Sequence, residues 1–342
     1  MEPRTRHYKH ALIGFGGANM LVAAYLVRHA STDPRDIIII DPHFDGGDLR
    51  RRWGSVISNT TWSQFLGVLR DMHLELPPNT PAYLEDQPTP LHVLASTLQA
   101  AVEPHIRLAT RIKAPLLASR KQGDAWELEV AKQKAKHTAT TLHVAPGGVP
   151  IDLPFPKPEI PLHVALTPSL LPQYVSPGQI VAVFGSAHSS ILVADNIVKA
   201  GGHVNMIFKR IPGASAEAFL FARDGAYDGV KQTAAVAADQ ILADGMGRRV
   251  YLVPVDDSVA VHTALEESSW AVYGVGFKPV PIRILDEAGA EIQLGLAQQQ
   301  QPGHSNIYKW GIAYPSTTTI DGRTYVDVSL PAFAAHILAV RP

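Results

Sequence analysis

An apolar strand that runs directly into a glycine turn near the N-terminus constrains the fold more than any other feature of this sequence. Residues 10–13 lead into Gly14-Phe15-Gly16-Gly17-Ala18-Asn19, a helical stretch covers 20–28, and Ile37-Ile38-Ile39-Ile40 ends in Asp41. Strand, glycine turn, helix and a second strand with a terminal acid are the parts of a dinucleotide-binding βαβ unit. Glycines let backbone amides approach a pyrophosphate, the helix N-terminus favours its charge, and the acid accepts hydrogen bonds from ribose hydroxyls.

The third glycine of this fingerprint is replaced by Asn19, but the flanking elements and the terminal acid favour binding. The alternative interpretation is a tight turn in an α/β domain that holds no ligand. The residues predicted to bind the dinucleotide in this unit are Gly14, Gly16, Gly17, Asn19 and Asp41.

A second unit of the same kind begins with an apolar strand over 179–184. The turn at 185–190, a helix over 191–199 and a strand over 204–208 follow, and this strand ends in Lys209-Arg210 instead of an acid. Cations there would hold a 2′-phosphate, so the pattern favours NADPH over NADH. The alternative is a surface turn with solvated cations. The predicted binding residues are Gly185, Ser186, His188, Ser189, Lys209 and Arg210.

Two nucleotide units in one chain of this length predict an α/β fold with two Rossmann-like domains, the second inserted in the first. A helix is expected over 90–101, and the alternating segments 126–130 and 140–145 predict a β-meander. Strands are also expected over 269–276 and 306–314. The predicted division is a first dinucleotide-binding domain over 1–162, a second one over 163–268, and a segment over 269–342 that returns to the first.

Composition excludes several classes of function. Lys and Arg total 30 against 31 for Asp and Glu, so no basic field favours nucleic acid and none is expected as a partner. The chain has no cysteine, which excludes disulfides, thiolate metal sites and dithiol redox pairs. Any redox chemistry therefore belongs to a bound cofactor. The histidines form no convincing ligand pair and no Gly-x-Ser-x-Gly elbow occurs, so neither a metal site nor a serine hydrolase is expected.

The sequence lacks the pattern of a secretory signal and any stretch of about 18 apolar residues, so we expect a soluble cytoplasmic protein with no membrane span. The oligomeric state is left open between a monomer and a homodimer.

Several further segments carry a resemblance to flavoproteins of the glutathione-reductase type, and above all to the flavin-containing monooxygenases. Gly46-Gly47 followed by 55–60 resembles the segment that crosses the flavin ring. Ala145-Pro146-Gly147-Gly148-Val149-Pro150 resembles the linker to the second domain, and 308–313 resembles the late segment that returns to the flavin. The longer monooxygenase fingerprint, Phe-x-Gly-x-x-x-His, is not found before the second turn. This resemblance implies FAD and NADPH as cofactors and a small organic molecule as substrate.

By this resemblance the flavin would be contacted by Trp53, Ser58, Thr60, Gly311 and Ile312. Asn59 is the predicted catalytic residue, because a neutral amide can hydrogen-bond oxygen at the flavin or the nicotinamide amide. The alternative for Asn59 is a turn or helix cap, since Ser, Asn and Thr are all favoured there. The alternative for Trp53 is a residue of the hydrophobic core with no contact to the flavin.

Three functions remain open on the sequence. The first is an NADPH-dependent FAD monooxygenase, the second a flavin reductase or oxidase that passes electrons to a quinone, oxygen or a partner protein, and the third a noncatalytic flavin-binding protein. Because cysteine is absent, the disulfide-reductase branch of the superfamily is excluded.

Overall fold

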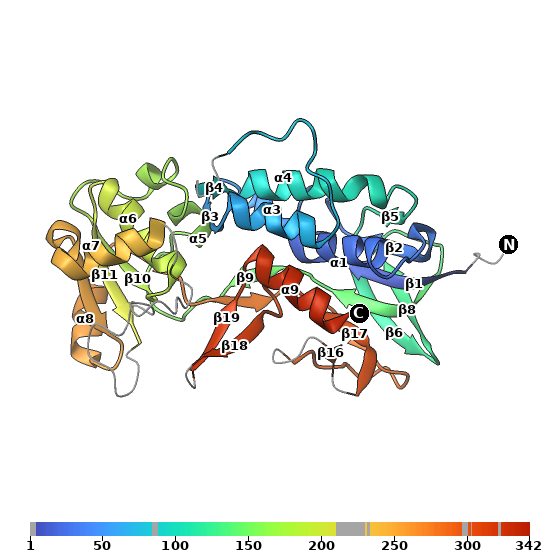
Figure 1. The fold of residues 1–342 in the computed structure, drawn as a ribbon. Coiled ribbons are helices and arrows are strands. Elements are labelled where there is room, and N and C mark those ends of the chain that lie inside the picture. Colours follow the sequence, from blue (N-terminus) through green and yellow to red (C-terminus); the bar gives the residue numbers. More distant parts are fainter. Residues whose placement is uncertain are drawn as a thin grey trace. The chain divides into compact units, whose positions relative to one another are not determined.

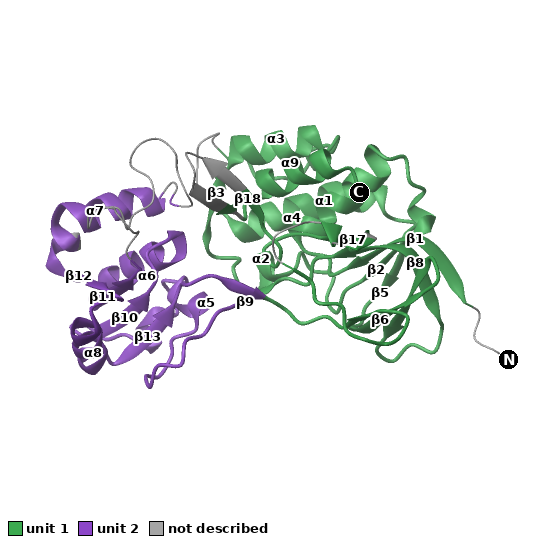
Figure 2. Cartoon of the chain, turned by 90° about the horizontal axis from the view of Figure 1, so that it is seen from below, with its two compact units in different colours: residues 1–148, 279–318, 326–342 green, residues 149–278, 319–325 purple. Residues whose placement is uncertain are grey.

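The computed structural model describes residues 5–83, 88–209, 230, 233–295, 300–301, 303–320 and 323–342. The chain forms two compact units, shown in different colours in Figure 2. Unit 1 comprises 1–148, 279–318 and 326–342, and unit 2 comprises 149–278 and 319–325. Unit 2 is therefore inserted in unit 1, as the sequence predicts.

The core of unit 1 is a parallel sheet. Its strands, in spatial order, are β17 (His304–Lys309), β8 (His137–Val144), β1 (Arg6–Ile13), β2 (Ile37–Ile40) and β5 (Thr110–Ile112). All four isoleucines of β2 are buried, which is expected of a parallel strand covered on both faces. In register, Ile13 of β1 lies between Ile40 of β2 and Val144 of β8, so the carboxyl ends of these strands meet at one edge.

An antiparallel meander extends this sheet at β8. β6 (Leu116–Gln122) pairs with β7 (Ala125–Val130), and β7 pairs with β8, as the alternating pattern predicts. β15 (Ile284–Leu285) joins β6 in parallel, and β16 (Gln300–Gln301) pairs with β17.

Helices cover one face of the sheet in unit 1 (Figure 1), and the meander covers the other. The helices that share a buried cluster are α1 (Gly17–Arg28), α3 (Trp62–Asp71), α4 (Leu91–Val102) and α9 (Leu330–Val340). The short elements of this unit are α2 (Asp48–Arg51) and the pair β3 (Ile57–Thr61) and β4 (Pro88–Pro90). This layering leaves the N-terminus of α1 at the carboxyl edge of the sheet.

Unit 2 is a four-stranded parallel sheet with helices. Its strands, in spatial order, are β12 (Val250–Pro254), β11 (His203–Phe208), β10 (Ile180–Phe184) and β13 (Trp270–Tyr273). The helices are α5 (Leu162–Ala165), α6 (His188–Lys199), α7 (Thr233–Arg248) and α8 (Ser258–Glu267). Both nucleotide-type βαβ units thus form as predicted, and the α/β class with two Rossmann-like sheets is confirmed.

The limits of the two units differ from the predicted 1–162, 163–268 and 269–342. The strand expected over 269–276 is β13. It pairs with β10 in the sheet of unit 2, where Trp270 lies opposite Val181. Where the chain leaves and re-enters unit 1, β9 (Gly148–Pro150) pairs with β14 (Phe277–Pro279). The strand expected over 306–314 ends at Lys309, and β18 (Ser316–Ile320) and β19 (Arg323–Asp327) follow.

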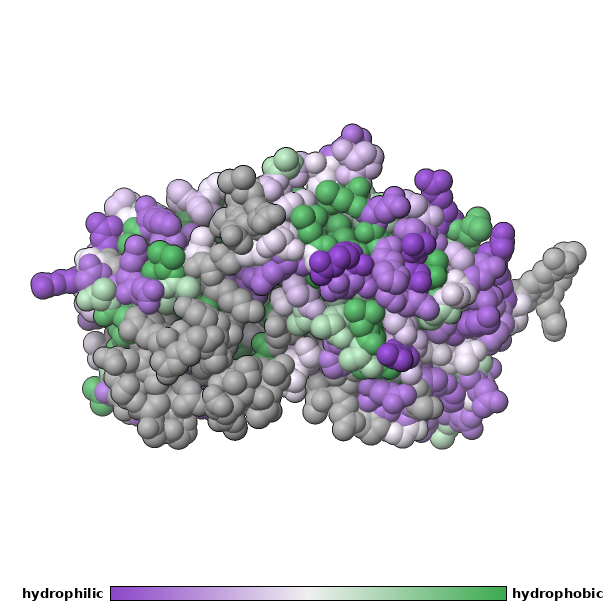
Figure 3. Space-filling view, viewed as in Figure 1, coloured by the Kyte–Doolittle hydropathy of each residue, from purple (hydrophilic) through white to green (hydrophobic). Residues whose placement is uncertain are grey.

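The surface of the described residues mixes hydrophilic and apolar side chains. Figure 3 shows this mixture on one face, with apolar side chains gathered over part of the helical layer of unit 1. α9 adds to the apolar surface, since Ala335 and Ala339 are exposed. Among the described residues, no helix is long and apolar enough to cross a membrane.

Candidate functional site

The first glycine turn joins the end of β1 to α1 with no room for side chains. Gly14 has φ +82°, and a Cβ there would collide with the backbone oxygen of Ala145. A Cβ on Gly17 would lie 2.9 Å from a methyl carbon of Leu330, and one on Gly47 would lie 2.9 Å from the Cα of Gly16. Close backbone approach and the left-handed conformation therefore require Gly14 and Gly47, whereas a Cβ on Gly17 would meet only the ends of leucine side chains.

The N-terminus of α1 has no side chain that caps it. Gly16 is the N-cap, it can offer no side-chain acceptor, and the first turn holds no acid. The first backbone N–H groups of a helix have no intrahelical acceptor, and the helix dipole makes this end positive. The arrangement is suited to an anion such as a pyrophosphate.

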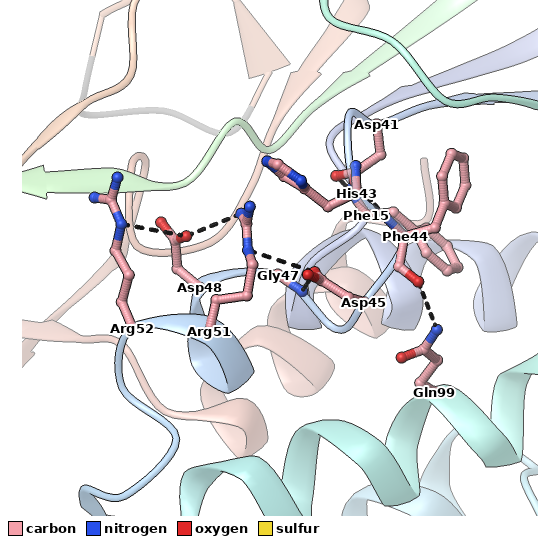
Figure 4. Close-up of polar contacts among 10 residues, drawn as sticks. All are labelled: Phe15, Asp41, His43, Phe44, Asp45, Gly47, Asp48, Arg51, Arg52 and Gln99. Atoms are coloured by element: carbon pink, nitrogen blue, oxygen red, sulfur yellow. Dashed lines mark hydrogen bonds and ion pairs between the residues drawn. The ribbon is translucent and has the colours of Figure 1, made fainter.

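Asp41 fixes the turn from the end of β2 (Figure 4). Its Oδ2 accepts the N–H of Phe15 at 2.7 Å, and its Oδ1 accepts the N–H groups of His43 and Phe44, each at 2.7 Å. The side chain is 8% exposed. A carboxylate offers about four acceptor positions, and three are occupied within the protein. Asp41 therefore organises two loops, and one of its acceptor positions has no partner among the hydrogen bonds of the described residues.

A polar side chain takes the place of the third glycine in both units. Asn19 is fully buried, and its Nδ2 lies 3.0 Å from the oxygen of Ile13 and 2.8 Å from that of Gly14. In unit 2 the Oγ of Ser190 donates to the oxygens of Phe184 and Gly274 at the same edge of the sheet. Each side chain ties its helix to strand ends. The structure thus places Asn19 on the backbone, in a bracing role that the sequence did not suggest.

A pocket brings the first turn together with segments far apart in the chain. Its cavity volume is about 100 Å³, and it is partly open to solvent. Five predicted residues line it, Gly16, Gly17, Trp53, Gly311 and Ile312, and the remaining lining residues are Ala18, Asp48, Leu49, Ala145, Gly147, Gly148, Trp310, Val328 and Phe333. The glycine turn, the linker and the late segment therefore share one site in unit 1. Ser58, Asn59 and Thr60 do not line this pocket.

The segment around Asn59 forms β3 and then a capped helix. The N-cap of α3 is Thr61, whose Oγ1 accepts the N–H of Gln64, while the Gln64 side chain accepts the N–H of Thr61. The alternative of Asn59 as the helix cap is therefore wrong, since this capping box is complete two residues later. Ser58 is buried and its Oγ accepts the N–H of Thr60. Asn59 is half-buried, and its side chain makes no hydrogen bond to another described residue.

A histidine pair, with His143 buried and His10 half-buried, supports the late segment, and the sequence did not indicate it. The indole Nε1 of Trp310 donates to Nδ1 of His143 at 3.4 Å, and Nε2 of His143 then donates to Nδ1 of His10 at 3.0 Å. Tyr308 stacks on both His143 and Trp310. Burial lowers the pKa of His10 to about 4, assisted by the charge of Lys9, and burial holds the pKa of His143 well below its usual range. Both rings are therefore neutral near pH 7.

The second turn keeps one true glycine. Gly185 has φ +104°, and α6 begins at His188 without a side-chain cap or an acid in its first turn. Ser186 is buried, Ser189 is half-buried, and Lys209 is exposed directly after β11. Arg210 lies outside the described residues. The described part of the chain holds no group of three or more His, Asp or Glu side chains that could bind a metal ion.

No protein-family model and no curated protein matches the chain. Solved structures match it over nearly its whole length. A bacillithiol disulfide reductase from Staphylococcus aureus is 12% identical, with 98% of this chain and 100% of that chain covered and a TM-score of 0.59. A flavin-containing monooxygenase from Stenotrophomonas maltophilia is 15% identical, with coverages of 98% and 97% and a TM-score of 0.58. A thioredoxin reductase from Lactococcus lactis is 13% identical, with coverages of 96% and 94% and a TM-score of 0.53.

At these identities the similarity establishes the fold. The three proteins are flavoproteins with two dinucleotide-binding domains, and this chain has their fold. The predicted resemblance is confirmed at that level.

Proposed function

We propose that this chain, which has the fold of the two-dinucleotide-domain flavoproteins, is an FAD- and NADPH-dependent oxidoreductase. The observation that supports this most directly is the pocket of unit 1, where an uncapped helix N-terminus, a glycine linker and the late segment at 310–312 come together. FAD, when bound, would supply the redox chemistry by taking electrons from NADPH and passing them to an acceptor. The protein's part is to bind, orient and exclude water.

The residues of unit 1 fit FAD on three counts. Gly16 and Gly17 have no side chains of their own, and they lie at the positive end of a helix, where a pyrophosphate is favoured. Asp41 keeps one acceptor position for a ribose hydroxyl. Trp53 and Trp310 offer apolar walls in the same pocket.

NADPH is proposed for unit 2 on the basis of its own glycine turn and the cations after β11. Gly185 and the uncapped start of α6 repeat the arrangement of unit 1, whereas exposed Lys209 takes the place of Asp41. A charge-assisted contact with a 2′-phosphate contributes about 1.5–3 kcal/mol. Replacing Lys209 or Arg210 with Ala should then raise the Michaelis constant for NADPH about tenfold and leave that for NADH nearly unchanged.

The proposed reaction is oxygenation of a small organic substrate, and the second candidate is a reductase or oxidase that passes electrons to a quinone, oxygen or a partner protein. A flavin-containing monooxygenase and a thioredoxin reductase both share the fold. Dithiol exchange is excluded because the chain has no cysteine. Asn59 is assigned to the first candidate by the family resemblance; its half-buried amide does not cap α3, and it lies outside the lining of the pocket in unit 1.

The first experiment measures cofactor content and use. Purified protein should be yellow, release FAD and not FMN on heating, and lose its visible absorbance when NADPH is added under nitrogen. A colourless protein that takes up no FAD on titration would refute the proposal. FAD uptake without any bleaching by NADPH would identify a noncatalytic flavin-binding protein.

The second experiment separates oxygenation from oxidase activity with a matched pair of variants. Asn59→Ala should raise the hydrogen peroxide formed per NADPH while FAD content and melting temperature stay near those of the wild type. Thr61→Ala removes the cap of α3, so it should cost about 1 kcal/mol of stability and leave peroxide yield unchanged. Equal peroxide yields in the wild type and Asn59→Ala would refute the role of Asn59.

A further inference from the structure

The pocket of unit 1 contains a single ionisable side chain. Its other lining residues are glycines, alanines, aliphatic side chains and aromatic side chains, and Asp48 alone among them carries a charge. Asp48 is the first residue of α2, directly after Gly47, which touches the turn at Gly16. A fixed charge in an otherwise neutral pocket decides which part of a ligand can lie beside it.

The two oxygens of Asp48 have different surroundings (Figure 4). Oδ1 accepts from Nη2 of Arg51 at 3.1 Å and lies 3.8 Å from Nε of Arg52. Oδ2 makes no hydrogen bond to another described residue, and it lies on the side of Gly147, where a Cβ would be 3.6 Å from it. The side chain is only 23% exposed. The arginines therefore hold the carboxylate in place, and Oδ2 remains an acceptor at the pocket wall.

Charge divides the pocket into two parts. The N-terminus of α1 favours an anion. The Asp48 carboxylate has the opposite preference: it repels a phosphate, and as an acceptor it favours a neutral ligand group that donates a hydrogen bond. FAD carries its hydroxyl donors on the ribityl chain and the ribose, on either side of the charged pyrophosphate, whereas its other donors, flavin N3–H and the adenine amino group, lie toward the two ends of the molecule.

We propose that Asp48 is a binding and orienting residue of the FAD site, whose Oδ2 accepts a hydrogen bond from a cofactor hydroxyl and keeps phosphate away from that part of the pocket. This inference rests on the proposed binding of FAD in unit 1. The opposing interpretation is that Asp48 merely pairs with Arg51 to stabilise α2.

Asp45 provides the matched control. It also pairs with Arg51, at 3.4 Å, and its Oδ1 accepts the N–H of Gly47 at 3.3 Å, a bond that the amide oxygen of Asn can keep; it does not line the pocket. Wild type, Asp48→Ala, Asp48→Asn and Asp45→Asn are prepared without cofactor, and FAD affinity is measured by titration calorimetry alongside the melting temperature. Asp48→Ala should weaken FAD binding about tenfold, and Asp45→Asn should leave it within twofold, while both lower the melting temperature by similar small amounts.

Inorganic pyrophosphate probes the exclusion of phosphate. Asp48→Asn keeps the shape but loses the charge, so pyrophosphate should compete with FAD at about tenfold lower concentration than in the wild type. Riboflavin and ADP locate the hydroxyl: a loss of affinity in Asp48→Ala that is shared by riboflavin assigns the ribityl chain, and one shared by ADP assigns the ribose. A loss shared by lumiflavin, which has neither, would overturn the hydroxyl contact.

The outcomes separate this inference from the proposed function. If the wild type binds no FAD, the proposed function itself fails. If the wild type binds FAD and the dissociation constant of Asp48→Ala for FAD is within threefold of that of the wild type, only the role of Asp48 is overturned.

Discussion

Replacing Asp41 with Asn should destabilise unit 1 even without a cofactor. The carboxylate accepts three backbone N–H groups at 2.7 Å, from Phe15 on one oxygen and from His43 and Phe44 on the other. An amide has one oxygen, so whichever way it turns, its NH₂ faces at least one N–H. If it keeps the two bonds to the loop after β2, the N–H of Phe15 loses its acceptor, and Phe15 is 1% exposed.

The expected cost follows from these contacts. An unsatisfied buried donor costs about 1–3 kcal/mol, and the two remaining bonds lose the assistance of the charge. The variant should therefore lose about 2–4 kcal/mol in urea unfolding of the cofactor-free protein. Asp36→Asn is the control, because its exposed pair with Lys9 contributes at most about 1 kcal/mol. A loss below about 0.5 kcal/mol in Asp41→Asn would show that these bonds do not hold the turn.

Two further predictions concern the turn and the histidine pair. Gly14→Ala should cost more than about 3 kcal/mol, because its Cβ would meet the oxygen of Ala145, whereas Gly123→Ala, also at positive φ but with open space around it, should cost only about 1–2 kcal/mol. Similar losses of unfolding free energy in the two variants would mean that the backbone at Ala145 moves to make room for the new Cβ. Acidification should weaken the fold through His10, because its pKa is about 4 in the folded protein and about 6.5 when unfolded. The unfolded state then binds the proton more tightly, so about 3 kcal/mol present above pH 6.5 is lost as the pH falls to 4. Unfolding measured at pH 7 and pH 4.5 should show a smaller difference in His10→Gln than in the wild type, and an equal difference would contradict the assignment.

The two βαβ units could be predicted from the sequence because their signals are local. A glycine turn, the strand before it, the helix after it and the acid or cations at the end of the next strand lie within a few tens of residues, and each has its own steric or electrostatic reason. The uncapped start of α1 and the position of Asp41 at the end of β2 followed from this pattern. The boundary at 269 was misplaced because an apolar strand does not reveal which of two parallel sheets it will join.

The remaining parts of the site depend on contacts between residues distant in the chain. Asn19 was predicted to bind the dinucleotide, and only the packing of β1 against β8 shows its amide bonded to strand ends. The chain from His10 through His143 to Trp310 joins three separate strands or their ends, and no spacing in the sequence signals it. Nothing in the sequence singled out Asp48, and only the fold places it in the pocket. Sequence periodicity and turn chemistry thus determined which elements form, whereas burial and the desolvation of each polar group, which depend on neighbours brought in by the fold, decided what the individual side chains do.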